Sequence, residues 1–304
     1  MSGPPRLFDR ELHRRRLTRA ARGYTSANFL KQRAADDIVQ RLETVRRDFP
    51  IAVDLGARDG AFARALAKSD AGAKVGVLFQ TDLAEAMLAG RHGQMLVVDE
   101  ERLPFAPESL DLIVSSLALH WTNDFVGALI QIRESLKPDG LFLGAIYGGA
   151  TLIELRAALM SAELELLGGC GPRVSPFADT FDAAALLQRA GFALPVADID
   201  RVTVRYDNIF DLMADLRAMG ETSTLVEGAG RPLRRPVLAR AAEIYADKFA
   251  DPDGRLVATF EILTMTGWAP AATQQQPLHP GSARMRLADA LNVRERSAGE
   301  RAGG

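Results

Sequence analysis

The segment from Ile51 to Gly60, I-A-V-D-L-G-A-R-D-G, constrains the fold more than any other part of the chain. Its residues up to Asp54 have the apolar pattern of a buried strand, a tight glycine-bearing turn follows, and a helical pattern begins at Ala61. A strand, a glycine turn and a helix in this order open a nucleotide-binding βαβ unit. Gly60 stands where the chain must pass a ligand closely or adopt a positive φ angle. We therefore expect the carboxylate of Asp54 to face a ligand at the carboxyl end of the strand.

Further acidic residues follow the next two predicted strands. The strand pattern at residues 74–79 ends just before Asp82, whose carboxylate can accept hydrogen bonds from both hydroxyls of a ribose. The pattern at 95–98 ends at Asp99 and Glu100, where an acid can accept from an adenine amino group. This crowd of acids would repel a pyrophosphate, whereas it would attract a cationic nucleoside. The acids therefore favour S-adenosylmethionine over a dinucleotide.

Strand and helix patterns alternate from Ile51 to Leu143, which predicts a parallel, doubly wound sheet. Each strand pattern is short, apolar and bounded by turn residues, as expected for strands that are buried on both faces. The helix that follows Asp124 is expected to end at Leu136, because the segment Lys137-Pro138-Asp139-Gly140 stops it. The strand patterns lie near Ile51, near Val75, near Leu96, at 110–115 and at 141–146.

The motifs of this region have a characteristic order and spacing: V-D-L-G-x-x-x-G, T-D-L-A-E-A-M-L, L-P-F-A-P-E-S-L-D-L-I-V-S-S-L-A-L-H-W and L-K-P-D-G-L-F-L. On these motifs the stretch from Ile51 to Tyr147 resembles the class I S-adenosylmethionine-dependent methyltransferases. Within that superfamily the chain resembles the complex I assembly factors described as arginine hydroxylases, on the segments F-D-R-E-L, S-S-L-A-L-H-W-T-N-D, V-S-P-F and M-T-G-W. It is also similar to the malonyl-carrier-protein methyltransferases of biotin synthesis.

The resemblance implies an α/β fold with a Rossmann-like, doubly wound sheet of about seven strands, mostly parallel with an antiparallel last strand, and a helical cap. It also implies S-adenosyl-L-methionine as the cofactor. The expected cofactor contacts are Asp54, Gly56, Ala57, Arg58, Gly60, Asp82, Leu83, Asp99, Glu100 and Ser116. The histidines form no dense cluster of metal ligands, and we expect no metal site.

Three side chains at the carboxyl edge of the predicted sheet are candidates for catalysis. His120 and Trp121 follow the fourth strand, and Tyr147 follows the fifth. Such positions lie beside a bound cofactor and face the substrate in open α/β sheets. The structural alternatives are that Trp121 packs under a loop and that His120 caps a helix.

Arg58 departs from the methyltransferase pattern, because it replaces the middle glycine of G-x-G-x-G. An arginine there brings a long cation near a cofactor that is already a cation at its sulfur. We expect the side chain to turn outward and to pair with an acid such as Asp59 or Glu85. Two alternatives remain open: Arg58 holds the carboxylate of the cofactor, or the site tolerates the charge because it no longer methylates.

The residues before Ile51 contain an arginine-rich arm at 6–22 and an amphipathic helix at 27–47. The arm includes acidic residues, which mitochondrial transit peptides avoid. It is expected to be a solvated helix or, alternatively, a segment that folds over the cofactor or grips a partner. Tyr24 or Phe29 could help to close the cofactor pocket, although core packing is the stronger expectation for Phe29.

The sequence divides by pattern into four parts. Residues 1–50 form the basic arm and helix, 51–150 the cofactor-binding core, 151–270 the cap helices with the final strands, and 271–304 a disordered tail. In the third part, the Gly/Pro-rich loop at 168–176 is long enough to be a lid. A strand interrupted by charge is expected at 193–206 and a long strand at 255–268. The helices between them, within 210–249, are expected to sit above the pocket.

The composition of the chain excludes some classes of protein. A net charge of -2 and a pI near 6.1 give no reason to expect nucleic acid as a partner. The single Cys170 fits a reducing compartment, and no apolar run approaches the ~20 residues of a membrane span. Peripheral association with a membrane stays open. We expect a cytoplasmic location for a bacterial chain, or the mitochondrial matrix for a eukaryotic one.

Two classes of function remain. The first is an enzyme that transfers a group, most simply a methyl group, from S-adenosylmethionine to a protein or to a carrier-bound acceptor. The resemblance implies either modification of a complex I subunit, with hydroxylation of an arginine, or O-methylation of a malonyl-carrier-protein thioester. The second class is a non-catalytic assembly factor that binds the cofactor and grips a partner subunit.

Overall fold

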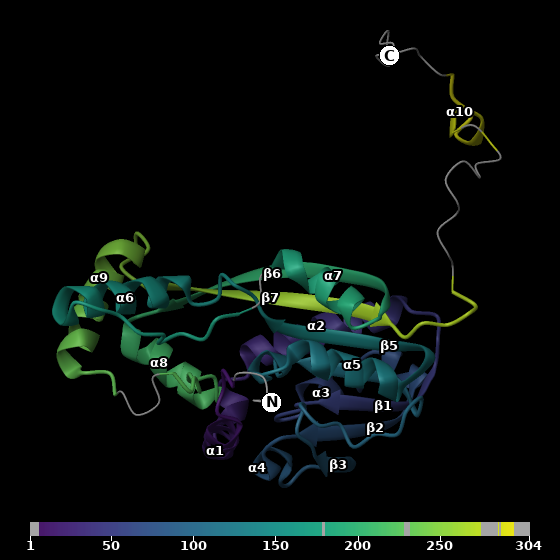
Figure 1. The fold of residues 1–304 in the computed structure, drawn as a ribbon, viewed down its shortest axis with the longest axis horizontal. Helices are drawn as coiled ribbons and strands as arrows, with labels where there is room; N and C mark the ends of the chain where they lie inside the picture. Colours follow the sequence, from purple (N-terminus) through teal and green to yellow (C-terminus); the bar gives the residue numbers. More distant parts are fainter. Residues whose placement is uncertain (1–5, 178–179, 228–231, 275–284, 286, 295–304) are drawn as a thin grey trace, which may run out of the picture. The chain divides into compact units, whose positions relative to one another are not determined.

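The computed structural model describes residues 6–177, 180–227, 232–274, 285 and 287–294. The chain forms two units, one up to Pro270 and one from Ala271 onward. Within the first unit the described residues form a seven-stranded sheet with the order β3-β2-β1-β4-β5-β7-β6 (Figure 1). The strands are β1 Phe49–Leu55, β2 Val75–Asp82, β3 Gln94–Val97, β4 Leu110–Ser116, β5 Leu136–Tyr147, β6 Ala193–Tyr206 and β7 Leu256–Trp268.

The first five strands run parallel to one another, and β7 runs antiparallel to both of its neighbours, β5 and β6. This confirms the expected α/β class, a mostly parallel doubly wound sheet with an antiparallel last strand. Consecutive parallel strands need crossover connections, and helices lie in all of them except the one from β3 to β4. The carboxyl ends of the parallel strands therefore meet at one edge of the sheet, where ligands of such folds bind.

Helices cover both faces of this sheet (Figure 1). The helices of the first unit are α1 Arg10–Ala20, α2 Phe29–Thr44, α3 Ala61–Leu66, α4 Glu85–Leu88, α5 Phe125–Ser135, α6 Ile153–Leu167, α7 Thr180–Arg189, α8 Ile209–Ala218 and α9 Arg235–Phe249. Three short 3-10 segments accompany them, η1 Tyr24–Ser26, η2 Asp70–Lys74 and η3 Leu119–Trp121. In the second unit the described residues contain α10 Leu287–Ala290, and most of the expected tail lies outside the described residues.

Two apolar cores explain why successive residues of a strand are both buried. On β1, Ala52 points into a core with α2, α3 and α6, whereas Val53 points into a core with α5 and α7. Side chains of a strand alternate between the two faces, so a strand that is covered on both sides has an unbroken apolar run. All seven residues of β4 are buried. The central strands of the sheet are thus held by packing on both faces, next to the edge that carries the acidic residues.

The long strand β6 corrects one expectation. Residues 193–206 form one strand along β7 rather than a strand that charge interrupts. The reason lies in α2, because Arg33 pairs with Asp200 and Arg41 pairs with Asp198 at 2.6 Å. These acids stand on the exposed face of an edge strand, where a paired charge costs little. The charged residues within residues 193–206 therefore do not interrupt the strand.

The residues around the first helices bring a second correction. Phe29 is 40% exposed, so the expectation that it packs in the core is wrong. Tyr24, the other aromatic candidate in this region, is buried between α1 and α2. Helix α1 begins after Asp9, whose carboxylate accepts from the backbone N–H of Leu12, a common N-cap arrangement. The arginine-rich arm is therefore a capped helix with a buried side.

Phe142 tests the core between β5 and α7. Its side chain is 0% exposed, and its ring lies 5.6 Å from that of Phe192. Phe142→Ala should lower the free energy of unfolding by about 3–5 kcal/mol, because it leaves a cavity in a close-packed core. Urea denaturation measures the loss. Phe210→Ala on α8, where the side chain is 57% exposed, should change stability by about 0.5 kcal/mol or less; equal losses for both variants would contradict this packing.

Candidate active site

The glycine turn after β1 has the backbone that the sequence predicts. Gly56 and Gly60 have φ angles of 69° and 78°, and Arg58 between them has a φ of 50°. These left-handed conformations cost least for glycine. A Cβ atom on Gly56 would come within 2.3 Å of the Cβ of Ala118, so this turn packs closely against the segment after β4. The backbone N–H of Ala57 donates to the carbonyl of Thr81 at 2.7 Å and fixes the turn to β2.

Asp54 ends β1 beneath this turn. Its side chain is 0% exposed, and neither carboxylate oxygen has a hydrogen-bond partner among the described residues. Burial raises the pKa of Asp54 to about 6, while the charges of Lys31 and Arg91 oppose that shift. An unpartnered buried carboxylate is costly for a fold. It is therefore a strong candidate for binding a cationic ligand group.

Lys31 on α2 holds the two sides of the site together, and the sequence did not single it out. Its ammonium donates to the carbonyl oxygen of Gly56 at 2.7 Å, to the carbonyl oxygen of Ser116, and to the Oγ of Ser116 at 3.0 Å. The side chain is buried, and burial lowers the pKa of Lys31 to about 8. The signal in the sequence that could have identified Lys31 was its position on the apolar face of α2. Ser116, an expected cofactor contact, is thus already bonded within the chain.

Arg58 does not turn outward, and that expectation is wrong. The side chain is 0% exposed, and its Nη1 donates to Oδ2 of Asp82 at 2.8 Å, as does the backbone N–H of Arg58 at 3.0 Å. The other carboxylate oxygen of Asp82 accepts from the N–H of Ala84 at 3.0 Å. Asp59, the expected partner, is instead held by Asn28 and Arg64. The acid that was expected to bind a ribose therefore already binds a guanidinium.

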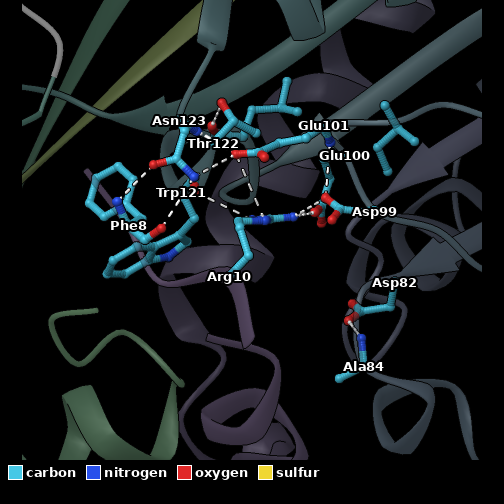
Figure 2. A network of polar contacts seen from close by, with 12 residues as sticks. Phe8, Arg10, Asp82, Ala84, Asp99, Glu100, Glu101, Trp121, Thr122 and Asn123 are labelled. Atoms are coloured by element: carbon cyan, nitrogen blue, oxygen red, sulfur yellow. Dashed lines mark hydrogen bonds and ion pairs between the residues drawn. The ribbon is translucent and has the colours of Figure 1, made fainter. Parts of the chain in front are cut away.

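The acids after β3 also hold a guanidinium, which comes from α1. Arg10 pairs with Oδ1 of Asp99 at 2.6 Å and with the buried carboxylate of Glu100, and it donates to the carbonyl of Trp121 at 3.3 Å. Figure 2 shows this side chain reaching from the helix to the acids, with Asp82 and Ala84 nearby. Helix α1 of the arginine-rich arm therefore lies against the acids that follow β3. The separation of 89 residues between Arg10 and Asp99 hid this pair from pattern analysis.

The segment before α1 is fixed in the same way. The backbone N–H of Phe8 donates to Oδ1 of Asn123 at 2.8 Å, and the Asn123 amide donates back to the carbonyl of Phe8 at 3.2 Å. Helix α1 buries Leu17 in an apolar cluster that includes Leu83. Leu83 thus contacts α1 rather than open solvent, and α1 closes this side of the site.

The three candidate catalytic residues lie together in the structure. His120 and Trp121 form η3, and the ring of His120 lies 4.8 Å from that of Tyr147. Trp121 Nε1 and His120 Nε2 both contact Oε2 of Glu221, at 2.9 and 3.1 Å. His120 does not cap a helix, because its hydrogen bond goes to this carboxylate. Trp121 also packs against Phe8, so its packing and its polar contact coexist. Glu221, between α8 and α9, was not found from the sequence.

The charge pattern fits S-adenosylmethionine in one part and not in another. The free carboxylate of Asp54 fits a cationic ammonium group. In contrast, Asp82 and Glu100 are engaged by Arg58 and Arg10, so they offer no free acid to a nucleoside in this arrangement. Each of these pairs is buried, and a buried charge pair has a large energetic cost when one partner is removed. A nucleoside could form hydrogen bonds with Asp82 and Glu100 only if the side chains of Arg58 and Arg10 moved away from these acids.

Two further findings describe what the site and the chain do not contain within the described ranges. No group of three or more His, Cys, Asp or Glu side chains there has an arrangement that could hold a metal ion. In the same part of the chain, every helix is too short or too polar to cross a membrane.

The pKa of Asp54 generates a prediction for stability against pH. Its folded pKa of about 6 lies above the ordinary value of 3.8 for an aspartate, so the folded state binds the proton more tightly than the unfolded state. The contribution of Asp54 to stability is therefore present at low pH and is lost as the pH rises through about 4 to 6. Relative to Asp54→Asn, the wild type should lose about 3 kcal/mol across that window.

Urea denaturation at several pH values measures this difference. The exposed Asp36 on α2 provides the control, since Asp36→Asn should keep the pH dependence of the wild type. Parallel stability curves for the wild type and Asp54→Asn would show that Asp54 titrates normally and is not a buried, unpaired acid.

Comparison with solved structures agrees with this fold. The YcgJ protein from Bacillus subtilis superposes with a TM-score of 0.52 at 16% sequence identity, and the match covers 77% of this chain and 98% of that chain. At this identity the similarity concerns the fold alone. A family model described as a methyltransferase domain matches residues 53–144, which span the strands from β1 to β5.

Comparison with curated proteins is more specific. The chain is 40% identical over 296 residues to the arginine hydroxylase NDUFAF5, mitochondrial, of Rattus norvegicus, with 95% of this chain and 85% of the relative covered. It is 33% identical over 303 residues to the malonyl-[acyl-carrier protein] O-methyltransferase of Halorhodospira halophila, with 97% and 98% covered. Both matches extend through the cap as well as the core. The chain therefore belongs to the family of S-adenosylmethionine-dependent methyltransferase-like proteins that includes the arginine hydroxylase NDUFAF5.

Proposed function

We propose that this protein binds S-adenosylmethionine and modifies an arginine side chain of a protein subunit. The observation that carries the proposal is the free, buried carboxylate of Asp54 at the carboxyl end of β1, inside a methyltransferase fold. The arginine hydroxylases among the relatives supply the target residue. When bound, S-adenosylmethionine would supply an activated methyl group on a sulfonium cation. A subunit of respiratory complex I is the first substrate to examine.

Different residues of the chain would bind the cofactor and face the acceptor. Asp54 would hold the ammonium group of the cofactor, and the turn from Gly56 to Gly60 would lie along it. Asp82 and Glu100 would receive the nucleoside in place of Arg58 and Arg10. His120, Trp121 and Tyr147, together with Glu221, would face the acceptor, because η3 follows β4, Tyr147 ends β5, and Glu221 contacts both residues of η3.

Mass spectrometry of complex I subunits from a strain that lacks this protein tests the proposal. An arginine-containing peptide should lose an added mass in that strain, and the mass difference distinguishes a methyl group from an oxygen atom. The wild-type gene should restore the modification, and an Asp54→Asn gene should not. Unchanged subunits, or full restoration by Asp54→Asn, would contradict the proposal.

A second candidate function is O-methylation of a malonyl-carrier-protein thioester. It is favoured by the 33% identity over 97% of the chain to an enzyme of that name. Purified protein should then methylate a malonyl-loaded carrier protein, and the deletion strain should need biotin for growth. Growth without biotin and no methylation of the carrier would eliminate this candidate and leave the arginine proposal untouched.

Arg58 generates a prediction for cofactor binding. It holds Asp82 and adds positive charge beside a cationic ligand. Arg58→Gly should therefore bind S-adenosylmethionine more tightly than the wild type, by about tenfold, because a freed carboxylate forms charge-assisted hydrogen bonds. In the ligand-free state the same variant should lose about 3 kcal/mol of stability or more, because Asp82 remains buried without a partner.

Calorimetry and thermal unfolding measure both quantities. Arg64→Ala is the matched control, since Arg64 pairs with Asp59 at the surface of α3, and it should change neither value strongly. The double variant Arg58→Gly/Asp82→Asn should regain stability without the gain in affinity. Weaker binding by Arg58→Gly would show that the arginine itself contacts the cofactor.

A further inference from the structure

An apolar cavity of about 310 Å³ lies next to the candidate active site. Its walls come from α6, α8 and the loop that joins α6 to α7. Leucine side chains and the ring of Phe177 supply much of the apolar surface: Leu152, Leu155, Leu159, Leu216, Leu233 and Phe177. Glu221 is the carboxylate that lines it, and Trp121 lies beside Glu221 in the same wall. The cavity therefore combines a largely apolar lining with a single acid among its lining residues, next to η3.

Glu221 is held in place by one oxygen and leaves the other available. Its Oε2 accepts from Trp121 Nε1 and contacts His120 Nε2, whereas its Oε1 accepts no hydrogen bond from the described residues. The side chain is 7% exposed. Glu221 lines the cavity, where its unused oxygen can accept charge-assisted hydrogen bonds from a cationic ligand. A cationic group that pairs with the unused oxygen of Glu221 would reach this oxygen through the apolar cavity.

Aromatic rings surround the same position. The ring of His120 lies 5.4 Å from that of Trp121, 4.8 Å from Tyr147 and 6.0 Å from Phe177. Ring faces attract cations, and the planar guanidinium group stacks on them better than the compact ammonium group of lysine does. An acid set among aromatic rings therefore favours arginine over lysine.

We propose that this cavity binds the arginine side chain of the protein substrate, with the methylene stem along the leucines and the guanidinium on Glu221. The inference rests on the proposed function and adds the recognition site and its specificity-determining residue. Glu221 is here a binding residue. It would place the guanidinium next to His120, whose ring lies against Tyr147.

The arginines that line the cavity refine the expected substrate. Arg16 is fixed by the carbonyl groups of Thr222 and Ser223, and Arg173 pairs with Glu163 at 2.6 Å. Arg217 lines the same cavity. These cations oppose an isolated positive ligand, but they would attract acidic neighbours of the target arginine. The preferred substrate is therefore an arginine that is flanked by aspartate or glutamate.

A peptide pair tests the proposal on the full-length protein. The first peptide is acetylated and amidated and has one arginine between two aspartates; the second has citrulline, which is neutral but similar in shape, in place of the arginine. The wild type should bind the arginine peptide about tenfold or more tightly than the citrulline peptide, because a charge-assisted pair is lost. Calorimetry and Trp121 fluorescence measure the two affinities.

Variants assign the preference to Glu221. Glu221→Gln keeps an oxygen that accepts from Trp121, so it should fold, and it should bind both peptides equally. The exposed Glu227 in the same connection is the matched control, and Glu227→Gln should keep the preference for arginine. An equal affinity of the wild type for both peptides, or a preference that survives in Glu221→Gln, would overturn the proposal.

The same experiments separate this inference from the proposed function. Glu221→Gln should still bind S-adenosylmethionine, which calorimetry measures without any substrate. A loss of arginine modification with retained cofactor binding agrees with the inference. Full modification by Glu221→Gln would refute the inference while the proposed function stands. Absence of cofactor binding by the wild type would refute the proposed function, whatever the peptides show.

Discussion

Buried negative charge at one edge of the sheet is the constraint on which the rest of the structure depends. A parallel sheet brings the ends of β1, β2 and β3 together, and each end carries an acid. Three cations from outside the strands approach them: Lys31 from α2, Arg58 from the turn and Arg10 from α1. A charge that leaves water needs a partner or a hydrogen bond. The positions of the first two helices therefore follow from the charges on the sheet as much as from apolar packing.

Trp121 connects this charged edge to the segment between α8 and α9. Its backbone carbonyl accepts from Arg10, and its ring N–H donates to Glu221. The same residue therefore contacts the helix that covers the acids and the carboxylate that lines the cavity. A side chain that is 1% exposed has little freedom to move independently of either. The position of η3 therefore links the contact of α1 with the acidic edge of the sheet to the contact with Glu221.

Local patterns predicted the sheet well, because alternation and glycine turns are properties of short segments. The positions of the parallel strands, the positive φ of Gly60 and the place of Asp54 at the end of β1 follow from those segments alone. The pairs that close the site do not. Arg10 with Asp99 and Trp121 with Glu221 are separated by 89 and 100 residues, and no period or spacing connects them. The predicted outward direction of the Arg58 side chain was wrong for a related reason, because this side chain pairs with Asp82 on another strand.

The place of β7 in the sheet has a consequence for synthesis on the ribosome. Of the strands that the structure describes, β7 is the last to be made, yet it lies between β5 and β6 and pairs with both. The first five strands can associate as the chain emerges, whereas β6 has no neighbour until Trp268 has been added. Its unpaired edge is then a surface on which nascent chains can associate wrongly. The charged residues of β6, at Asp198, Asp200, Arg201 and Arg205, would oppose the pairing of that strand with other chains.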